Sequence, residues 1–259
     1  MAKKRTSAPP NPFKKRLLAG EPLIGVWSSL ASHLAAEMIS HSDFDWALFD
    51  GEHAPNEVAH MVNYLQAMRG SSVAPMVRPA WNDQVLLKRL LDIGFQNFVV
   101  PYVQNADEAR AAVAATRYPP QGIRGVAMAM RAADYGFATN YVQTANATMC
   151  VIVQVETEAA VADLDNICAV RGVDAVFVGP SDLAASLGHL GDSSHKDVQK
   201  VIRRVANTCA RHGTTSGILA RNVKEVEKYL KWGFRFIGAT SDTALLKAGM
   251  AGITDHFSK

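Results

Sequence analysis

Residues 151–156 read Val151-Ile152-Val153-Gln154-Val155-Glu156, an apolar and largely β-branched run that ends in a carboxylate. The run is too short to cross a membrane and is typical of a parallel strand that is buried on both faces. Side chains alternate along a strand, so Gln154 and Glu156 should lie on the same side, at its carboxyl end. Because α/β proteins keep their chemistry at that end, we expect Glu156 to belong to a functional site.

A second run of the same kind, Ala175-Val176-Phe177-Val178-Gly179-Pro180, leads into Ser181 and Asp182. Two acids that each follow a buried strand suggest a shared cation, and no zinc-type set of His and Cys side chains lies near them in the sequence. Oxygen ligands favour a hard divalent ion, with Mg2+ or Mn2+ fitting best and Co2+ able to substitute. The alternative is that both acids only begin helices, where the helix dipole favours negative charge.

Short apolar runs alternate with amphipathic segments along the whole chain, which is βα repetition. The predicted strands cover residues 24–27, 46–49, 74–77, 97–100, 151–155, 175–178, 215–218 and 235–238. The predicted helices cover residues 34–39, 58–68, 85–91, 107–115, 159–169, 196–211, 223–231 and 243–253, with N-caps at Asn82, Asn105, Ser181, Asn222 and Ser241. Eight parallel strands can close and leave no exposed edge, so the sequence predicts an α/β fold of the (β/α)8 TIM-barrel class.

The bulk composition agrees with one domain of this kind. The chain has 259 residues, a usual length for a barrel, and 48% of them are hydrophobic and 20% charged. We expect a single barrel domain over residues 13–259 and a flexible tail over residues 1–12, where the basic run Lys3-Lys4-Arg5 precedes a Pro-rich stretch. Segment 118–136 is rich in helix breakers and is predicted to be a long βα connection that carries Arg124 and Arg131.

Charge, hydropathy and cysteine usage argue against several classes of partner. The net charge of +3 is spread along the chain, which predicts no nucleic-acid binding and no attachment to an anionic membrane. No apolar run reaches about 18 residues, and no secretory signal pattern is present. The three cysteines stand at no metal-like spacing and fit a reducing compartment. We therefore expect a cytoplasmic protein that acts on small molecules.

Polar side chains also follow the second and third predicted strands. The second strand leads into Asp50-Gly51-Glu52-His53, and the third ends at Arg78-Pro79. His53 could act as a base whose tautomer is fixed by a neighbouring acid, although a lone loop histidine is more often a surface residue. The guanidinium of Arg78 could hold a substrate carboxylate or a developing enolate oxygen, or it could be a structural partner of Asp50 or Glu52.

Further observations narrow the chemistry. Asp92, at the end of the helix before the fourth strand, is a candidate to orient His53, although its position alone is more typical of a solvated acid at a helix end. No Lys occupies an inward strand position, which argues against a Schiff-base aldolase. The chain also lacks a Gly-x-Gly-x-x-Gly turn, a P-loop and a Gly-rich phosphate-binding loop, which argues against a nucleotide cofactor.

Six motifs follow one another along the chain. They are Asp45-Trp46-(x)3-Asp50-Gly51-Glu52-His53-Ala54-Pro55-Asn56, Val77-Arg78-Pro79, Leu91-Asp92-Ile93-Gly94, Thr116-Arg117-Tyr118-Pro119-Pro120-(x)3-Arg124-Gly125-Val126, Gln154-Val155-Glu156, and Phe177-(x)-Gly179-Pro180-Ser181-Asp182-Leu183. With these motifs in this order, the chain from about Gly25 to its C-terminus resembles the HpcH/HpaI family of class II, metal-dependent pyruvate aldolases.

The resemblance implies a role for each residue that matches a family motif. It implies a divalent metal ion on Glu156 and Asp182, an arginine on the pyruvate enolate at Arg78, and a base at His53 oriented by Asp92. It implies that Gln154, Asp182 and Arg78 contact the substrate and that Asp50 and Glu52 support the site. We also expect Ser181 to contact the substrate, at a position where many relatives carry Ala. The resemblance further implies a barrel of the phosphoenolpyruvate/pyruvate type that exchanges its C-terminal helix between subunits and assembles into a homohexamer, a trimer of dimers.

The reaction expected from this site is the reversible aldol cleavage of a 4-hydroxy-2-oxo acid to pyruvate and an aldehyde, through a pyruvate enolate that the metal stabilises. The alternatives are a carbon-carbon lyase that acts on a CoA thioester, as in citrate lyase-like relatives, and a non-catalytic metabolite-binding barrel. Oxaloacetate decarboxylation is expected as a side activity. Replacing Arg78 by Ala is expected to reduce turnover far more than stability.

Overall fold

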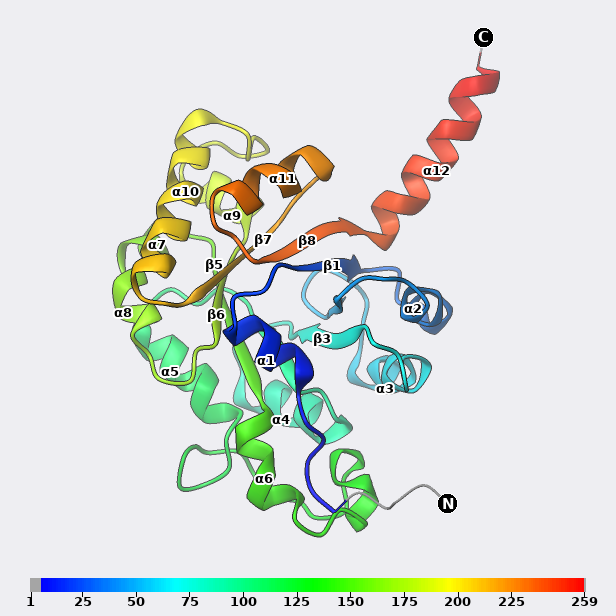
Figure 1. Ribbon diagram of the computed structural model, residues 1–259, viewed down its shortest axis with the longest axis vertical. Helices are drawn as coiled ribbons and strands as arrows, with labels where there is room; N and C mark the ends of the chain where they lie inside the picture. Colours follow the sequence, from blue (N-terminus) through cyan, green and yellow to red (C-terminus); the bar gives the residue numbers. More distant parts are fainter. Residues whose placement is uncertain (1–5, 259) are drawn as a thin grey trace.

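Eight parallel strands close into a barrel in the computed structural model, which describes residues 6–258 (Figure 1). The strands pair in chain order, and β1 pairs with β8 to complete the barrel. They are β1 (Leu23–Ser28), β2 (Trp46–Asp50), β3 (Ala74–Arg78), β4 (Asn97–Val100), β5 (Cys150–Val155), β6 (Ala175–Val178), β7 (Thr215–Leu219) and β8 (Phe236–Ser241). The predicted TIM barrel and its eight strands are confirmed.

Helices alternate with the strands and cover the outside of the barrel (Figure 1). They are α1 (Pro12–Leu18), α2 (His33–Ser40), α3 (Val58–Ala67), α4 (Gln84–Ile93), α5 (Ala106–Ala115), the 3-10 helix η1 (Arg131–Gly136), α6 (Tyr141–Thr148), α7 (Glu158–Ala162), α8 (Leu164–Cys168), α9 (Pro180–Ser186), α10 (Lys196–Arg211), α11 (Val223–Lys231) and α12 (Asp242–Phe257). Among residues 6–258, no helix is both long and apolar enough to span a lipid bilayer.

Side-chain capping explains where several helices begin. Asn105, Asn222 and Ser241 accept hydrogen bonds from backbone amides of the first turn, as predicted. Two predicted caps are wrong. Asp83, one residue after Asn82, caps α4, and α9 begins one residue before Ser181, at Pro180, whose missing amide hydrogen suits the first helical position.

The barrel interior is filled by alternate residues of each strand. Trp46 and Leu48 of β2 and Ile152 of β5 belong to one buried apolar cluster that also takes in Phe13 of α1. Helix α1 thereby closes the amino-terminal end of the barrel. A Cβ at Gly25 would lie 2.0 Å from the ring of Trp46, so glycine is required where this large side chain crosses the interior.

The same alternation places polar side chains at the other end of the barrel. Asp50 follows Trp46 and Leu48 along the inward row of β2, and Gln154 follows Ile152 along that of β5. Arg78 is the last inward residue of β3 and pairs in register with Asp50. The strand period that buries the core therefore also presents these three polar side chains at the carboxyl ends of the strands.

Part of the predicted N-terminal tail packs against the barrel. Residues 1–5 of that tail, including Lys3-Lys4-Arg5, lie outside the described residues. Ser7 forms a β-bridge with Asn140, and Asn11 donates hydrogen bonds to the Asn97 side chain and to the Thr148 carbonyl, each at 2.8 Å. The prediction of a flexible tail is therefore wrong for residues 7–11.

Segment 118–136 lies at the opposite end of the barrel from the one predicted. It follows α5 and precedes β5, so it belongs to an αβ connection at the amino-terminal end of the strands. Arg124 is buried there, over the ring of Tyr118 and 2.9 Å from Asp92, and Arg131 donates to the Ile93 carbonyl at 2.6 Å. Both arginines brace the end of α4, and the prediction of a βα loop is wrong.

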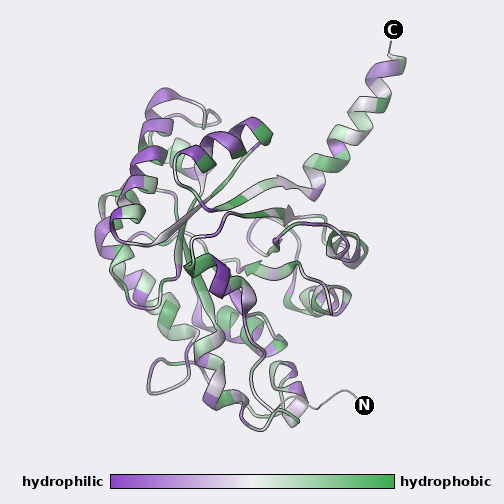
Figure 2. Ribbon diagram, viewed as in Figure 1, coloured by the Kyte–Doolittle hydropathy of each residue, from purple (hydrophilic) through white to green (hydrophobic). Residues whose placement is uncertain are grey.

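The last helix, α12, projects away from the barrel (Figure 1). Its first residue, Asp242, accepts hydrogen bonds from the Ser28 hydroxyl and from the backbone amides of Ser29 and Leu30, which anchors the helix to the end of β1. Beyond this anchor, apolar stretches along the projecting helix are evident in Figure 2. Five large apolar side chains of α12 are exposed: Leu245, Leu246, Met250, Ile253 and Phe257.

Candidate active site

A cavity of about 270 Å³ opens at the carboxyl ends of the strands. Its size is near the lower limit for small-molecule sites. It is lined by Trp27, His53, Arg78, Gln154, Glu156, Phe177, Gly179, Pro180, Ser181, Asp182 and Leu219. Six of the residues predicted from sequence thus meet in one cavity: His53, Arg78, Gln154, Glu156, Ser181 and Asp182.

Arg78 is held at the cavity by two carboxylates. Its Nε and Nη2 donate to the two oxygens of Asp50 at 2.9 and 2.7 Å, and its Nη1 lies 2.9 Å from Oε2 of Glu52. The ring of Trp27 lies beside the guanidinium, 5.1 Å from ring centroid to Cζ. Arginine carries five N–H donors, and the hydrogen bonds to Asp50 engage two of them. The contact with Glu52 is an ion pair without a hydrogen bond. The other three N–H groups are left for a bound anion.

The two partners of Arg78 respond differently to burial. Burial alone would raise the pKa of Asp50, but the hydrogen bonds and positive charge of Arg78 outweigh it and lower that pKa. For Glu52, burial is stronger than the attraction of Arg78, so the pKa of Glu52 is raised. Asp50 is therefore a permanent counter-charge for Arg78, whereas Glu52 is the more readily protonated of the two.

His53 stands at the rim, in the turn after β2. The backbone amides of Glu52 and His53 donate to Oδ1 of Asp50 at 3.0 and 3.3 Å, which fixes the turn. The imidazole is 64% exposed, and its Nε2 lies 3.8 Å from Oε2 of Glu52. The acid that faces this histidine within the protomer is thus Glu52, at a distance that leaves the ring free to reach a substrate.

Asp92 is not brought to His53 within one protomer. It lies in the last turn of α4, at the amino-terminal end of the barrel, where its Oδ1 accepts from Nη2 of Arg124 at 2.9 Å. His53 follows β2 at the carboxyl end. Asp92 could therefore orient His53 only across an interface between subunits.

Glu156 is buried at the back of the cavity with both oxygens held. Its Oε1 accepts from the Tyr102 amide at 2.9 Å, and its Oε2 accepts from Nε2 of Gln154 at 2.6 Å. Burial raises the pKa of Glu156 to about 7, and the charges of Glu52 and Asp182 add to this shift.

Glycine is required beside Glu156. A Cβ at Gly179 would lie 2.2 Å from Oε2 of Glu156, closer than any side chain can approach. The next residue, Pro180, starts α9, which places Asp182 in its first turn on the same cavity wall.

The donor set around Glu156 and Asp182 fits a hard divalent cation. Both carboxylates line the cavity, and Oε1 of Gln154 is buried there without a hydrogen-bond partner. A dication would favour the ionised form of Glu156, whose pKa is raised by burial and, to a smaller extent, by the charges of Glu52 and Asp182. Carboxylate oxygens are ligands that Mg2+ and Mn2+ prefer. Glu156 and Asp182 are therefore the residues that could hold the ion.

Three contributors to the site were not identified from sequence. Trp27 lies on the inward row of β1, which the strand period could have shown, and its indole N–H lies 3.4 Å from Oδ2 of Asp50. Gly179 precedes a proline after a buried strand, which is a weak signal. Tyr102 acts through its backbone amide, at a positive φ of 55°, and no side-chain pattern reports such a role.

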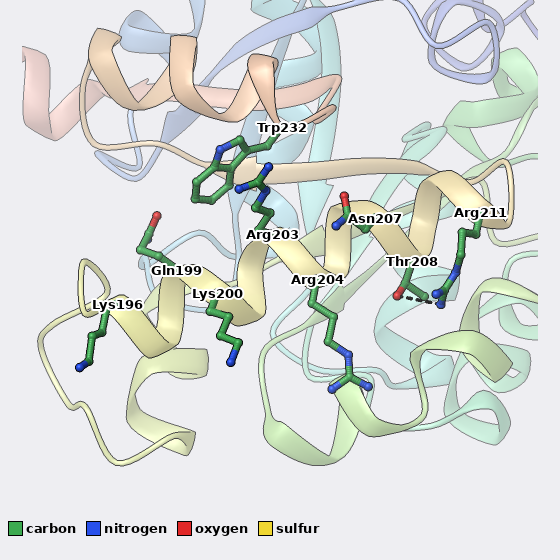
Figure 3. A pocket seen from close by; sticks show the side chains of 9 residues that line it. All are labelled: Lys196, Gln199, Lys200, Arg203, Arg204, Asn207, Thr208, Arg211 and Trp232. Atoms are coloured by element: carbon green, nitrogen blue, oxygen red, sulfur yellow. Dashed lines mark hydrogen bonds between the residues drawn. The ribbon is translucent and has the colours of Figure 1, made fainter.

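A larger cavity, of about 600 Å³, lies elsewhere, over the outer face of α10 (Figure 3). Its cationic lining residues are Lys196, Lys200, Arg203, Arg204 and Arg211. Figure 3 shows these side chains spread along one helix rather than converging on a point. No carboxylate is among the described residues that line it. The smaller cavity, where acids and an arginine converge, is therefore the candidate active site.

The fold and the cavity together indicate a class of protein: a (β/α)8 barrel enzyme with acids, an arginine and a histidine gathered at the carboxyl ends of its strands. Comparison with known proteins narrows this class. Residues 23–248 match the family model described as HpcH/HpaI aldolase/citrate lyase. The chain is 45% identical over 250 residues to the 5-keto-4-deoxy-D-glucarate aldolase of Escherichia coli O6:H1 strain CFT073, which covers 96% of this chain and 98% of that protein.

Solved structures agree. An HpcH/HpaI aldolase/citrate lyase family protein from Burkholderia cenocepacia J2315 superposes with a TM-score of 0.92 at 41% identity, over 96% of this chain and 100% of that one. An HpcH/HpaI aldolase from Desulfitobacterium hafniense DCB-2 gives a TM-score of 0.85 at 29% identity, over 94% and 95% of the two chains. The chain belongs to the HpcH/HpaI aldolase/citrate lyase family. It is an aldolase-type lyase that depends on a divalent metal ion.

Proposed function

We propose that the substrate is a 4-hydroxy-2-oxo acid of the type named for the E. coli relative, 5-keto-4-deoxy-D-glucarate, and that cleavage gives pyruvate and an aldehyde. The observation that carries this proposal is the 45% identity, which extends over 96% of the chain. The acids, arginine and histidine of that cavity suit an aldol reaction through an enolate.

Each residue has a proposed role that follows from its contacts. Glu156 and Asp182 would hold Mg2+ or Mn2+, with Co2+ able to substitute, and a bound ion would polarise the 2-oxo group as a Lewis acid. Arg78 would use its remaining N–H groups to bind the carboxylate and the oxygen at C2 of the substrate. Gln154 and Ser181, which also line the cavity, would position the substrate.

In the cleavage direction, His53 takes the proton of the C4 hydroxyl as the C3–C4 bond breaks. The electron pair of that bond moves into the pyruvate half, where negative charge develops on the oxygen at C2, and C4 becomes the carbonyl carbon of the aldehyde. Arg78 faces this charge from a fixed position, because Asp50 and Glu52 hold its guanidinium. Protonation of C3 then gives pyruvate.

Assembly is a second part of the proposal. The exposed apolar side chains of α12 are consistent with a helix that packs on a neighbouring subunit, as exchange of the C-terminal helix within a homohexamer, a trimer of dimers, would require. Such an assembly could also supply an Asp92 to a neighbouring His53. A cytoplasmic location remains a prediction.

A CoA thioester is the less suitable substrate. The phosphates of CoA would require several cations at the rim, and Arg78 is the one Lys or Arg among the described residues that line the cavity. Its guanidinium already faces Asp50 and Glu52. The non-catalytic alternative is excluded by the family to which the chain belongs.

A pyruvate-release assay tests the proposed reaction. We expect purified protein with Mg2+ or Mn2+ to release pyruvate from 5-keto-4-deoxy-D-glucarate, detected with lactate dehydrogenase, and to lose this activity in EDTA. Oxaloacetate decarboxylation, measured in parallel, should be slower. If the metal-loaded protein releases no pyruvate from 4-hydroxy-2-oxo acids but cleaves a CoA thioester, the proposal is wrong.

A further inference from the structure

A cluster of three metal-ligating side chains lies outside the active site, where the connection from α9 meets α10. His189 is in that connection, His195 is the N-cap of α10, and Asp197 is in its first turn. One ligand atom from each side chain lies within 4.8 Å of the other two. We propose that these three side chains bind a second divalent ion, with Zn2+ as the preferred metal, at a site separate from Glu156 and Asp182.

The distances are close to those that a zinc ion requires. Oδ2 of Asp197 lies 3.9 Å from Nε2 of His189 and 3.7 Å from Nδ1 of His195. Two ligands of a tetrahedral zinc ion are about 3.3 Å apart, because each bond is about 2.0–2.1 Å long. The side chains are 27% (His189), 31% (His195) and 60% (Asp197) exposed, so rotations at the surface can close this gap. The fourth position is open to water.

The connection is shaped to bring the two histidines together. Gly188 and Gly191 adopt positive φ values of 80° and 82°, which allow the chain to turn tightly on both sides of His189. The His195 amide donates to the Asp192 carbonyl at 3.2 Å, which closes the turn before α10. The two imidazole rings stack with their centroids 3.6 Å apart.

Ligand chemistry separates this site from the active site. Imidazole nitrogen together with one carboxylate is a donor set that suits Zn2+, whereas an all-oxygen set suits Mg2+ and Mn2+. Nδ1 of His195 now accepts a long hydrogen bond, 3.3 Å, from the Asp197 amide. Metal binding would replace this cap with a stronger bond and would tie the connection to the start of α10.

Zinc stoichiometry tests the proposal. The double variant Glu156→Gln/Asp182→Asn removes the proposed catalytic ligands, so any Zn2+ that it retains reports on the second site. We expect one Zn2+ per chain by elemental analysis after dialysis against Zn2+, and none when His189→Ala is added. The matched control is His212→Ala, because His212 is also partly exposed and lies 2.8 Å from one carboxylate, that of Asp165, but has no second histidine. This control should keep the ion.

A second variant distinguishes loss of the zinc ligand from a folding defect. His195→Asn can still cap α10 but is a poor zinc ligand, so it should also lose the ion while its circular dichroism spectrum stays unchanged. Zn2+ should raise the melting temperature of the Glu156→Gln/Asp182→Asn protein and should not raise it once His189→Ala is present. His189→Ala alone should release pyruvate at the wild-type rate.

Two results would overturn the second site. One is a double variant that binds no Zn2+, and the other is a Zn2+ content that His189→Ala leaves unchanged. Neither result bears on the proposed aldol reaction, which depends on Glu156, Asp182 and Arg78. Conversely, if the protein binds this Zn2+ but releases no pyruvate, the second metal site is supported and the proposed reaction is wrong.

Discussion

Arg78 lines the cavity at the carboxyl ends of the strands, and its guanidinium is ion-paired with Asp50 and Glu52. Asp50 is 2% exposed, so deleting the arginine would leave a buried carboxylate without its counter-charge. Breaking a buried pair in this way costs about 3–5 kcal/mol of stability. The structure therefore argues against the expectation that Arg78→Ala spares folding, and a substitution that keeps the positive charge is the better probe of catalysis.

Arg78→Lys should separate the two roles of this residue. Lysine keeps a positive charge beside Asp50 but cannot hold two carboxylates and a substrate with one rigid fork. We expect kcat/KM for pyruvate release to fall about a hundredfold, with a melting temperature well above that of Arg78→Ala. Arg89→Lys, at an exposed position of α4, is the control and should change neither quantity. Wild-type activity in Arg78→Lys would remove the guanidinium from the mechanism.

The pKa of Glu156, raised to about 7 by burial, predicts how metal binding depends on pH. A carboxyl group must lose its proton to bind a cation, so protons compete with the metal below about pH 7. Titration calorimetry with Mn2+ should show an affinity that rises from pH 6 through pH 7 and levels off towards pH 8. An affinity that is constant from pH 6 to pH 8 would contradict this.

The same shift affects the stability of the metal-free protein with the opposite sign. The pKa of Glu156 is higher in the folded state than its ordinary value of 4.5, so between about pH 4.5 and pH 7 the folded state binds more protons than the unfolded state. The contribution of Glu156 to the free energy of unfolding should therefore fall as pH rises through this window. Denaturant unfolding of Glu156→Gln should lack that contribution.

Gly179→Ala tests the packing around Glu156. The added Cβ would lie 2.2 Å from Oε2 of Glu156 and must displace this carboxylate. We expect metal affinity and turnover to fall together, while far-ultraviolet circular dichroism still shows a folded barrel. Gly249→Ala is the matched control, because a Cβ at Gly249 meets nothing within 4 Å. Unchanged metal affinity in Gly179→Ala would show that the carboxylate can move without consequence.

The alternation of side chains along the strands made most residues of the candidate site predictable from the sequence. Alternation along β2, β3 and β5 assigns Asp50, Arg78 and Gln154 to the interior without any knowledge of tertiary contacts. Asp92 could not be placed in this way, because its partner is Arg124, whose position depends on the irregular connection after α5. Likewise, the backbone amide of Tyr102 leaves no trace in the sequence.

The helices that could be predicted accurately are those with a strong hydrophobic period. The ends of α10 and α11 agree with the predicted ends, because one face of each helix is apolar and the opposite face is charged. Helices α1 and α6 were not predicted, since both are short and their burial depends on contacts with distant parts of the barrel. The predicted helix 159–169 is two helices, α7 and α8, that meet at Asp163.

Helix α12 is the element whose removal should change assembly without changing the barrel. Ending the chain after Ala244 keeps Asp242, which anchors the end of β1, and removes the five exposed apolar side chains. We expect sedimentation velocity to show a smaller particle than the full-length protein, with the far-ultraviolet spectrum still that of a barrel. Lys247→Ala, at an exposed polar position of α12, should not change the particle size. An unchanged oligomer after truncation would show that α12 does not join subunits.

In the whole molecule, the two ends of the barrel differ: stabilising contacts gather at the amino-terminal end, and the candidate active site lies at the carboxyl end. At the amino-terminal end, α1 closes the interior, and Arg124 and Arg131 brace the end of α4. At the carboxyl end, the cavity is lined by polar side chains on β3 and β5, just after β2 and β5, and in the first turn of α9. The eight-strand closure followed from the sequence because every strand is a short apolar run, whereas nothing in the sequence pattern of α12 predicts that it projects away from the barrel.

The central claim is that Glu156 and Asp182 hold one divalent ion beside Arg78 and thereby promote enolisation of pyruvate. The direct measurement is the exchange of pyruvate methyl protons with deuterium oxide, followed by proton nuclear magnetic resonance, which requires no knowledge of the aldehyde. We predict exchange with Mn2+ or Mg2+ present, and none after EDTA treatment or in Glu156→Gln or Asp182→Asn. Exchange that persists at the wild-type rate in these variants, or its absence from the metal-loaded wild type, would contradict the claim.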